Sequence, residues 1–259
     1  MRRVGAIAGH VEGAAAAPAA ANAVLYDVVL RGGSVYCSEL PDGTIADVGL
    51  WGDTIGAVEL PGVIPPGAGR EEVDASGRLV VPGLIDIHAH IYENVMAGAV
   101  NPDEACLSRC TTTAVDCGSA GTGTLDGFVK YIAAASTTRC LAFVNMNKHG
   151  IAAHPCYGHI DQVASVAEGS RAIRNHPEIT VGVKVLLTAA YANDGKTELE
   201  VYKRALELTA KEDLPLICHH SSSIIPVDHR RPRLEQSELE DCEVGCPSSL
   251  RPGDIYTHW

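Results

Sequence analysis

The chain has 259 residues, 46% of them hydrophobic, and a formal net charge of −12 with a pI near 5.3. This acidic balance disfavours nonspecific binding to nucleic acid or to an anionic membrane, because both prefer basic surfaces. No apolar run reaches the length of a membrane span. We therefore expect a globular protein with one large α/β domain, alone or with a smaller one.

Residues 1–23 have the composition of a low-complexity leader, with Arg2, Arg3 and an alanine-rich run over 14–17. Charged and glycine residues such as Glu12 interrupt the apolar core that a secretory signal needs, and an organelle transit peptide normally holds more Ser and Arg. A disordered extension is expected, with organelle targeting left open.

Nine cysteines are scattered along the chain without any Cys-x-x-Cys pair. An odd number of dispersed cysteines argues against a disulfide framework or a zinc finger. Reduced, buried thiols in a reducing compartment such as the cytoplasm are expected.

Residues 24–80 are expected to form a small antiparallel β unit, because short apolar runs alternate there with Gly and Asp-Gly turns. The segment 61–69 is rich in Pro and Gly and is expected to link this unit to the rest. The predicted strands are 27–30, 47–51 and 54–58.

From residue 81 onward, predicted strands and helices alternate, which is typical of a parallel sheet flanked by helices. The run 79–85 is so apolar that we expect a strand buried on both faces. The segment 118–123 follows a strand but lacks the G-x-G-x-x-G spacing, so no nucleotide cofactor is indicated. Further strands are predicted at 111–117, 141–144, 180–187, 216–219 and 255–258, with helices around 125–132 and 161–174 and one starting at the capping-box pattern Thr197-x-x-Glu200.

Four histidines lie where predicted strands finish. His88 and His90 are two residues apart, so in an extended strand both side chains point to one face. His219 and His258 end two later strands, and parallel α/β folds place their sites at the carboxyl ends of strands. The sequence thus predicts one shared metal pocket. His220 competes with His219 but would face the other way, and His149, His154, His159, His176 and His229 are expected to be ordinary loop or helix residues.

Lys184 lies inside the apolar strand 180–187 without a sequence neighbour that could pair with it. A lysine buried without a partner loses its charge or destabilises the fold. Lys184 therefore either extends outward to solvent or has a chemical role. A neutral lysine can react with carbon dioxide to form a carbamate, an anionic ligand able to bridge two metal ions.

The chain resembles the amidohydrolase superfamily of metal-dependent hydrolases, and within it the deacetylase-like group related to dihydroorotases, hydantoinases and N-acyl-amino-acid deacylases. The Pro-Gly-Leu-Ile-Asp-x-His-x-His segment is the most specific part of the resemblance, which reaches from about Tyr26 to the C-terminus. The stretches that carry it are 27–33, 73–90, 112–121, 182–185, 214–219 and 251–258.

The resemblance implies a (β/α)8 TIM barrel with a small β-sandwich domain. His88 and His90 would bind one divalent metal, with zinc expected, and carbamylated Lys184 would bridge to a second metal held by His219 and His258. A hydroxide shared by the metals would attack an amide or ester bond of a small acylated substrate. A homo-oligomer is left open, and no nucleic acid or membrane partner is expected.

The sequence departs from the family pattern at its C-terminal end. The resemblance implies a general-base aspartate on an eighth strand, whereas this chain stops after about six strands, and Asp254 belongs to the approach into the sixth. We therefore expect residues 81–259 to be a truncated barrel after a 24–80 β-sandwich portion. A noncatalytic remnant and a cyclic-amide hydrolase of the dihydroorotase or hydantoinase kind are the alternatives.

Overall fold

The computed structural model describes residues 24–152, 159–193, 195–234 and 236–258. Within this part the chain divides into two compact units, with the boundary between Pro82 and Gly83. The sequence pattern placed that boundary after Val80. The predicted leader, His154 and Cys156 lie outside the described residues. No helix in the described ranges has the length and apolar character needed to cross a bilayer.

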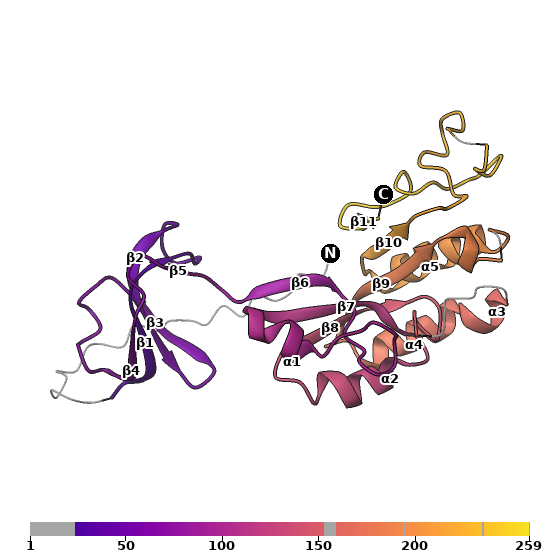
Figure 1. Cartoon of the computed structure of the whole chain (residues 1–259). Helices are drawn as coiled ribbons and strands as arrows, with labels where there is room; N and C mark the ends of the chain where they lie inside the picture. The colour runs from indigo at the N-terminus through magenta and orange to yellow at the C-terminus, as the bar shows by residue number, and fades with distance from the viewer. Residues whose placement is uncertain (1–23, 153–158, 194, 235, 259) are drawn as a thin grey trace. The chain divides into compact units, whose positions relative to one another are not determined.

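The first unit is a five-stranded sheet in the order β3-β2-β1-β4, with β5 also paired to β1 (Figure 1). The β1, β2 and β3 strands pair antiparallel, as the turn pattern predicted. The β4 and β5 strands run parallel to β1. The β4 strand was not predicted, and β5 is the first part of the run 79–85, which was predicted as one strand of the second unit. The strands are β1 (Tyr26–Val35), β2 (Thr44–Trp51), β3 (Thr54–Glu59), β4 (Gly69–Asp74) and β5 (Leu79–Val80).

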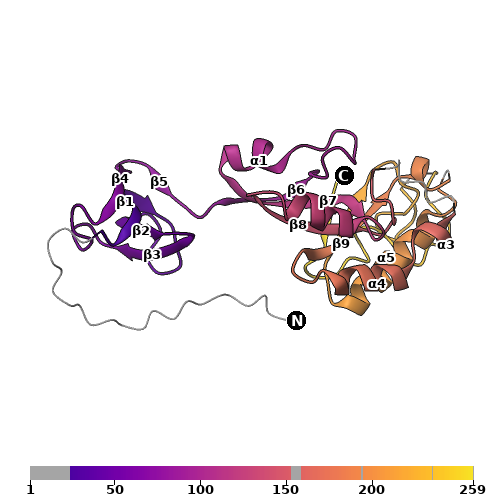
Figure 2. The ribbon, with the colours of Figure 1, turned by 90° about the horizontal axis from the view of Figure 1, so that it is seen from below.

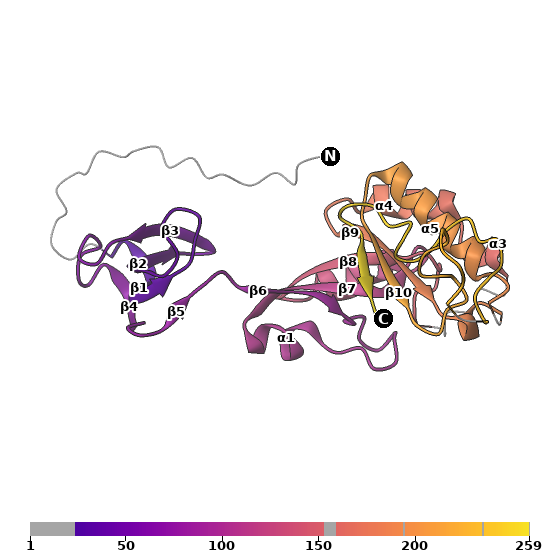
Figure 3. The same cartoon turned by 90° about the horizontal axis from the view of Figure 1, so that it is seen from above.

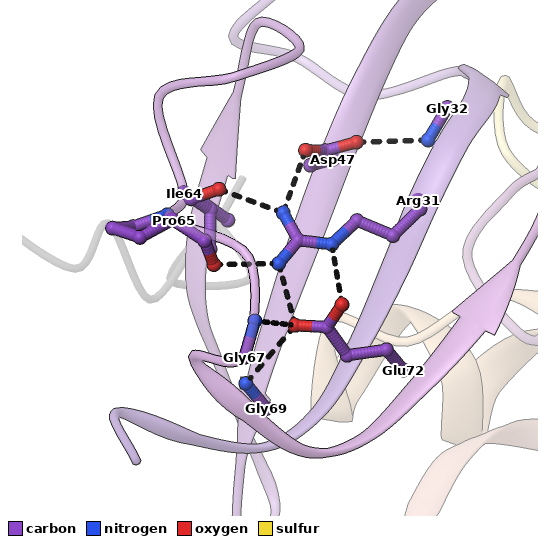
Figure 4. Close-up of polar contacts among 8 residues, drawn as sticks. All are labelled: Arg31, Gly32, Asp47, Ile64, Pro65, Gly67, Gly69 and Glu72. Atoms are coloured by element: carbon purple, nitrogen blue, oxygen red, sulfur yellow. Dashed lines mark hydrogen bonds and ion pairs between the residues drawn. The ribbon is translucent and has the colours of Figure 1, made fainter. Parts of the chain in front are cut away.

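The segment 61–69 is part of this unit and does not link it to the rest, so that prediction was wrong. The reason is Arg31, whose guanidinium donates to the carbonyl oxygens of Ile64 and Pro65 at 2.8 Å each (Figure 4). The same group pairs with Asp47 at 2.9 Å and Glu72 at 2.6 Å. A planar group with five donors can hold an irregular backbone that forms no strand.

The second unit contains a parallel sheet in the order β11-β10-β9-β8-β7-β6, which curls without closing (Figures 1 and 3). Figure 1 shows β11 beside β10 at one end of the sheet. The strands are β6 (Leu84–Ala89), β7 (Thr111–Gly121), β8 (Arg139–Asn145), β9 (Thr180–Leu187), β10 (Leu216–His220) and β11 (Ile255–Thr257). The helices are α1 (Pro102–Ala105), α2 (Leu125–Phe128), α3 (Ile160–Val163), α4 (Val166–Asn175) and α5 (Glu198–Glu212), with short helical turns η1 (Leu107–Arg109), η2 (Val129–Ala133) and η3 (Ala189–Tyr191).

The two faces of the sheet differ in what covers them. One face packs against helices, with α5 in contact with β9, β10 and α4. Figure 2 shows α4 and α5 side by side from below. Residues such as Val144, Val185 and Cys218 face this large core. A smaller apolar cluster including Cys117, Phe143 and Ile217 lies on the other face. Because side chains alternate along a strand, Lys184 and His219 fall on this second face.

The β6 strand is exposed, and the expectation that it is buried on both faces was wrong. Leu84, Ile85 and Ile87 are 55%, 64% and 51% exposed. The strand is the edge of the sheet and pairs with β7 alone among the described strands. An apolar run indicates a tendency to be buried, but the number of neighbours is decided by the topology.

The helices also depart from the predicted pattern in detail. The helix expected over 161–174 is two helices, α3 and α4, and the one over 125–132 is α2 followed by a π turn. Thr197 does precede α5, but its side chain forms no cap hydrogen bond within the described chain. Its ψ of 0° places the backbone outside the extended region that an N-cap side chain needs.

Candidate metal centre

The predicted metal ligands come together at the carboxyl ends of the parallel strands. The rings of His219 and His258 stack with centroids 4.0 Å apart, and His88 lies 5.1 Å from His258 and 5.9 Å from His90. His258 follows β11 rather than belonging to it, with a φ of 63°. This left-handed turn ends the strand one residue earlier than the sequence pattern predicted.

The four imidazoles are held in the neutral form. Burial, together with the charges of Lys184 and His258, lowers the pKa of His88 to about 4. Burial and the neighbouring His258 lower the pKa of His219 to about 3. The pKa values of His90 and His258 are lowered as well, by burial first and by Lys184 second. Neutral imidazoles present the lone pairs that a divalent metal requires.

Lys184 is buried at 1% exposure, so it does not extend outward to solvent. Its Nζ has no hydrogen-bond partner among the described residues. Burial lowers the pKa of Lys184, while the thiols of Cys117 and Cys218 oppose that change. Burial thus disfavours the ammonium form of Lys184, and any charge on it acts on all four imidazoles.

Gly118 gives the Lys184 side chain its space. A Cβ at residue 118 would lie 2.6 Å from Cγ of Lys184, and the glycine has a φ of 84°. Both the contact and the backbone conformation exclude an ordinary side chain there. The glycine-rich segment 118–123, which begins within β7 and does not fit a phosphate loop, thus provides space for the lysine.

Ser119 and Asp116 are polar residues beside the site to which the sequence analysis gave no role. The Ser119 hydroxyl lies 2.8 Å from Nδ1 of His90. Asp116 is fully buried and accepts hydrogen bonds from the backbone N–H groups of Ile91 at 3.2 Å and Ala120 at 2.9 Å. A charged residue within the apolar stretch of β7 was the signal in the sequence that could have identified it.

His220 has both ring nitrogens engaged. Its Nε2 lies 3.0 Å from the carbonyl oxygen of Ile225 and its Nδ1 lies 3.0 Å from the Tyr256 hydroxyl. Because the carbonyl only accepts, Nε2–H donates to it and Nδ1 accepts from the tyrosine. With both nitrogens occupied, His220 has no lone pair left for a metal.

Other candidates serve elsewhere in the fold. Asp254 accepts the backbone N–H of Leu216 at 2.7 Å, at the start of β10 and hence at the opposite end of the sheet from the histidines. His176 pairs with Asp126 at 2.6 Å, and His229 lies 3.0 Å from the Ser248 hydroxyl.

The side chains gathered here are of the types that bind divalent metals, but they are not arranged as in a formed metal site. Among the described residues, no group of three or more His, Cys, Asp or Glu side chains is arranged to hold a metal ion. Neutral imidazoles around an orphaned amine are nevertheless the chemistry that metal coordination and lysine carbamylation require. A cavity of about 510 Å³ lined by His220, Tyr256 and His258 lies beside these groups.

Curated deacetylases are similar to this chain in sequence. The chain is 28% identical to a deacetylase of Agrobacterium fabrum, with 84% of this chain and 46% of the relative covered. It is also 28% identical to a deacetylase of Brucella anthropi, with 73% and 43% covered. The chain thus spans about half the length of these curated relatives. No protein-family model matches it.

The fold itself occurs in a crystal structure of a dihydroorotase, with a TM-score of 0.71. The sequence identity is 23%, and the likeness covers 89% of this chain and 57% of that one. Sequence similarity to deacetylases and the shared fold together confirm the resemblance found in the sequence, namely a likeness to the deacetylase-like group of the amidohydrolase superfamily.

Proposed function

We propose that the chain supplies the metal-binding part of a hydrolase that cleaves an amide or ester bond in a small acylated substrate. Residues 83–258 form part of a (β/α)8 barrel in this proposal, and residues 24–82 part of a β-sandwich domain. The similarity to deacetylases supports the substrate class. The gathering of four neutral imidazoles around a buried, unpartnered lysine is the single observation that carries the proposal.

The ligands divide into two sets in this proposal. His88 and His90 hold one divalent metal, with zinc proposed, and His219 and His258 hold the second. Lys184 would be the ligand shared by both metals: its neutral amine can add carbon dioxide and release a proton to give an anionic carbamate, and its burial would shield that product from water. When bound, such metals lower the pKa of water and polarise a carbonyl group.

The cavity beside His258 offers a place for the acylated substrate. Its lining combines the His220 and Tyr256 side chains with the apolar Val227 and Pro247. The hydrogen bond between His220 and Tyr256 fixes both rings, so this wall is preorganised. A rigid, partly apolar wall suits a small organic acyl compound better than a polyanion.

Metal analysis tests the proposal. The full chain is expressed with zinc and bicarbonate, purified, and compared with Lys184→Ala and with Lys211→Ala, which removes an exposed lysine of α5. We expect close to two zinc ions in the unsubstituted chain and in Lys211→Ala, a mass increase of one carbon dioxide, and loss of the bridged ion in Lys184→Ala.

Two results would contradict parts of the proposal. Zinc content unchanged by Lys184→Ala rules out the bridging lysine, and a chain that binds no zinc supports the noncatalytic alternative. Profiling of the metal-loaded protein against acylated amino acids, esters and cyclic amides then separates a deacetylase from a hydantoinase-like enzyme.

A further inference from the structure

We propose that Ser119 and Asp116 are a positioning pair that holds His90 in its Nδ1–H tautomer and so presents Nε2 to the metal. The inference rests on the proposed metal site, but it concerns a property of the metal-free protein. It assigns a function to two buried polar residues that the ligand set does not use.

The direction of the hydrogen bonds follows from the groups involved. A serine hydroxyl carries one proton, and an ionised carboxylate can only accept. Both oxygens of Asp116 accept backbone N–H groups, Oδ1 from Ile91 and Oδ2 from Ala120, which is the pattern of an ionised carboxylate. The Ser119 side chain also hydrogen-bonds this carboxylate and, with the Ala120 backbone, opposes the rise in pKa that burial causes. Ser119 therefore donates its proton to Asp116.

The hydroxyl oxygen of Ser119 is then left as an acceptor toward His90. At 2.8 Å from that oxygen, Nδ1 of His90 must carry the proton of the bond. The second ring nitrogen, Nε2, keeps its lone pair. A carboxylate behind a metal-bound histidine is a recurrent device for fixing tautomer and ring orientation, and here a hydroxyl stands between the two groups.

Asp116 also fixes the backbone around His90. It accepts the backbone N–H of Ile91, directly after His90, and that of Ala120, directly after Ser119. Asp116 pairs with Ala89 in the register of β7 against β6, so all three groups meet at one point of the sheet. Both Asp116 and Ser119 are fully buried, and solvent cannot substitute for either hydrogen bond.

The experiment uses Ser119→Ala and Asp116→Asn in the full chain. The matched control is Thr180→Val, which removes a buried hydroxyl without a partner among the described residues, at the opposite end of β9. Nitrogen-15 NMR of histidine-labelled, metal-free protein at pH 8 reports the tautomer, with His90 assigned from the resonances that His90→Gln removes. Competition with a chelator gives the zinc affinity, and circular dichroism checks that each variant is folded.

We expect the Nδ1–H form of His90 in the unsubstituted chain and in Thr180→Val, and loss of that preference in both site variants. Zinc affinity should fall about 10- to 100-fold in Ser119→Ala and stay unchanged in the control. Ser119→Thr, which keeps a hydroxyl, should restore the tautomer, a result that a purely structural role would not produce.

The proposal is overturned if His90 keeps its Nδ1–H tautomer in Ser119→Ala, or if Thr180→Val weakens zinc binding equally. If the unsubstituted chain binds no zinc, the proposed function fails but the tautomer measurement still decides this inference. The two failures are therefore distinguishable.

Discussion

Replacing Lys184 with methionine should stabilise the metal-free protein. The lysine is 1% exposed and its Nζ has no hydrogen-bond partner in the described part of the chain. Folding therefore desolvates the amine and gives it no hydrogen bond in return. Methionine has a similar length and volume but no group that needs solvation. The substitution thus removes an energetic cost while leaving the packing of β9 nearly intact.

The magnitude follows from the cost of burying an unpaired polar group, about 1–3 kcal/mol in protein mutational data. The pKa of Lys184 is lowered in the folded state below its ordinary 10.5, so the unfolded chain binds more protons between those two values. The free energy of unfolding must therefore rise with pH through that window. The advantage of methionine is largest at pH 7 and shrinks as the pH approaches 10.5.

Urea unfolding in the presence of a chelator, at pH 7 and pH 10, measures both quantities. Lys211→Met removes an exposed lysine and should change the free energy of unfolding by less than about 0.5 kcal/mol. With zinc and bicarbonate the order should reverse, because binding stabilises the protein that holds the bridged site. A Lys184→Met protein that is less stable than the parent without metal would refute the reasoning, since the amine would then have a partner.

Two further predictions concern the arginine centre and the histidines. Arg31→Met should lower the free energy of unfolding by about 1–3 kcal/mol, because Asp47 and two carbonyl groups lose their donor. The control Arg70→Met, at an exposed ion pair with Asp27, should change the free energy of unfolding by less than about 0.5 kcal/mol. Equal effects of the two substitutions in urea unfolding would contradict the role of Arg31. In metal-free protein, NMR titration should place the pKa of His88 near 4 and that of His219 near 3, so stability is fully present above pH 6.5 and declines as the pH falls toward 4. Titration of both residues near 6.5 would show that they are solvated.

The positions of most strands were predictable because they depend on local patterns. Apolar runs with turn residues between them located β7 to β11 to within a few residues. Their parallel pairing followed from the helices that alternate with them. The β4 strand and the pairing of β5 with β1 were missed, since nothing local distinguishes a strand that returns to β1 from one that leaves the unit.

The candidate ligands were predictable for a different reason. The spacing of His88 and His90 and the position of His219 at a strand end depend on the strand period and on parallel topology. The part played by Ser119 could not be predicted, because it depends on the distance between a hydroxyl of β7 and a ring that follows β6. Distances between strands are set by packing and not by sequence separation.

The sequence alone determined which chemical groups are available and that they stand at strand ends, because residue type and strand period are local properties. Only the tertiary structure decided that Lys184 is buried without a partner, that β6 is exposed, and that His220 is engaged elsewhere. Solvation and hydrogen-bond partners are properties of the space around a side chain. That space is formed by segments far apart in the chain, so a local sequence pattern cannot predict it.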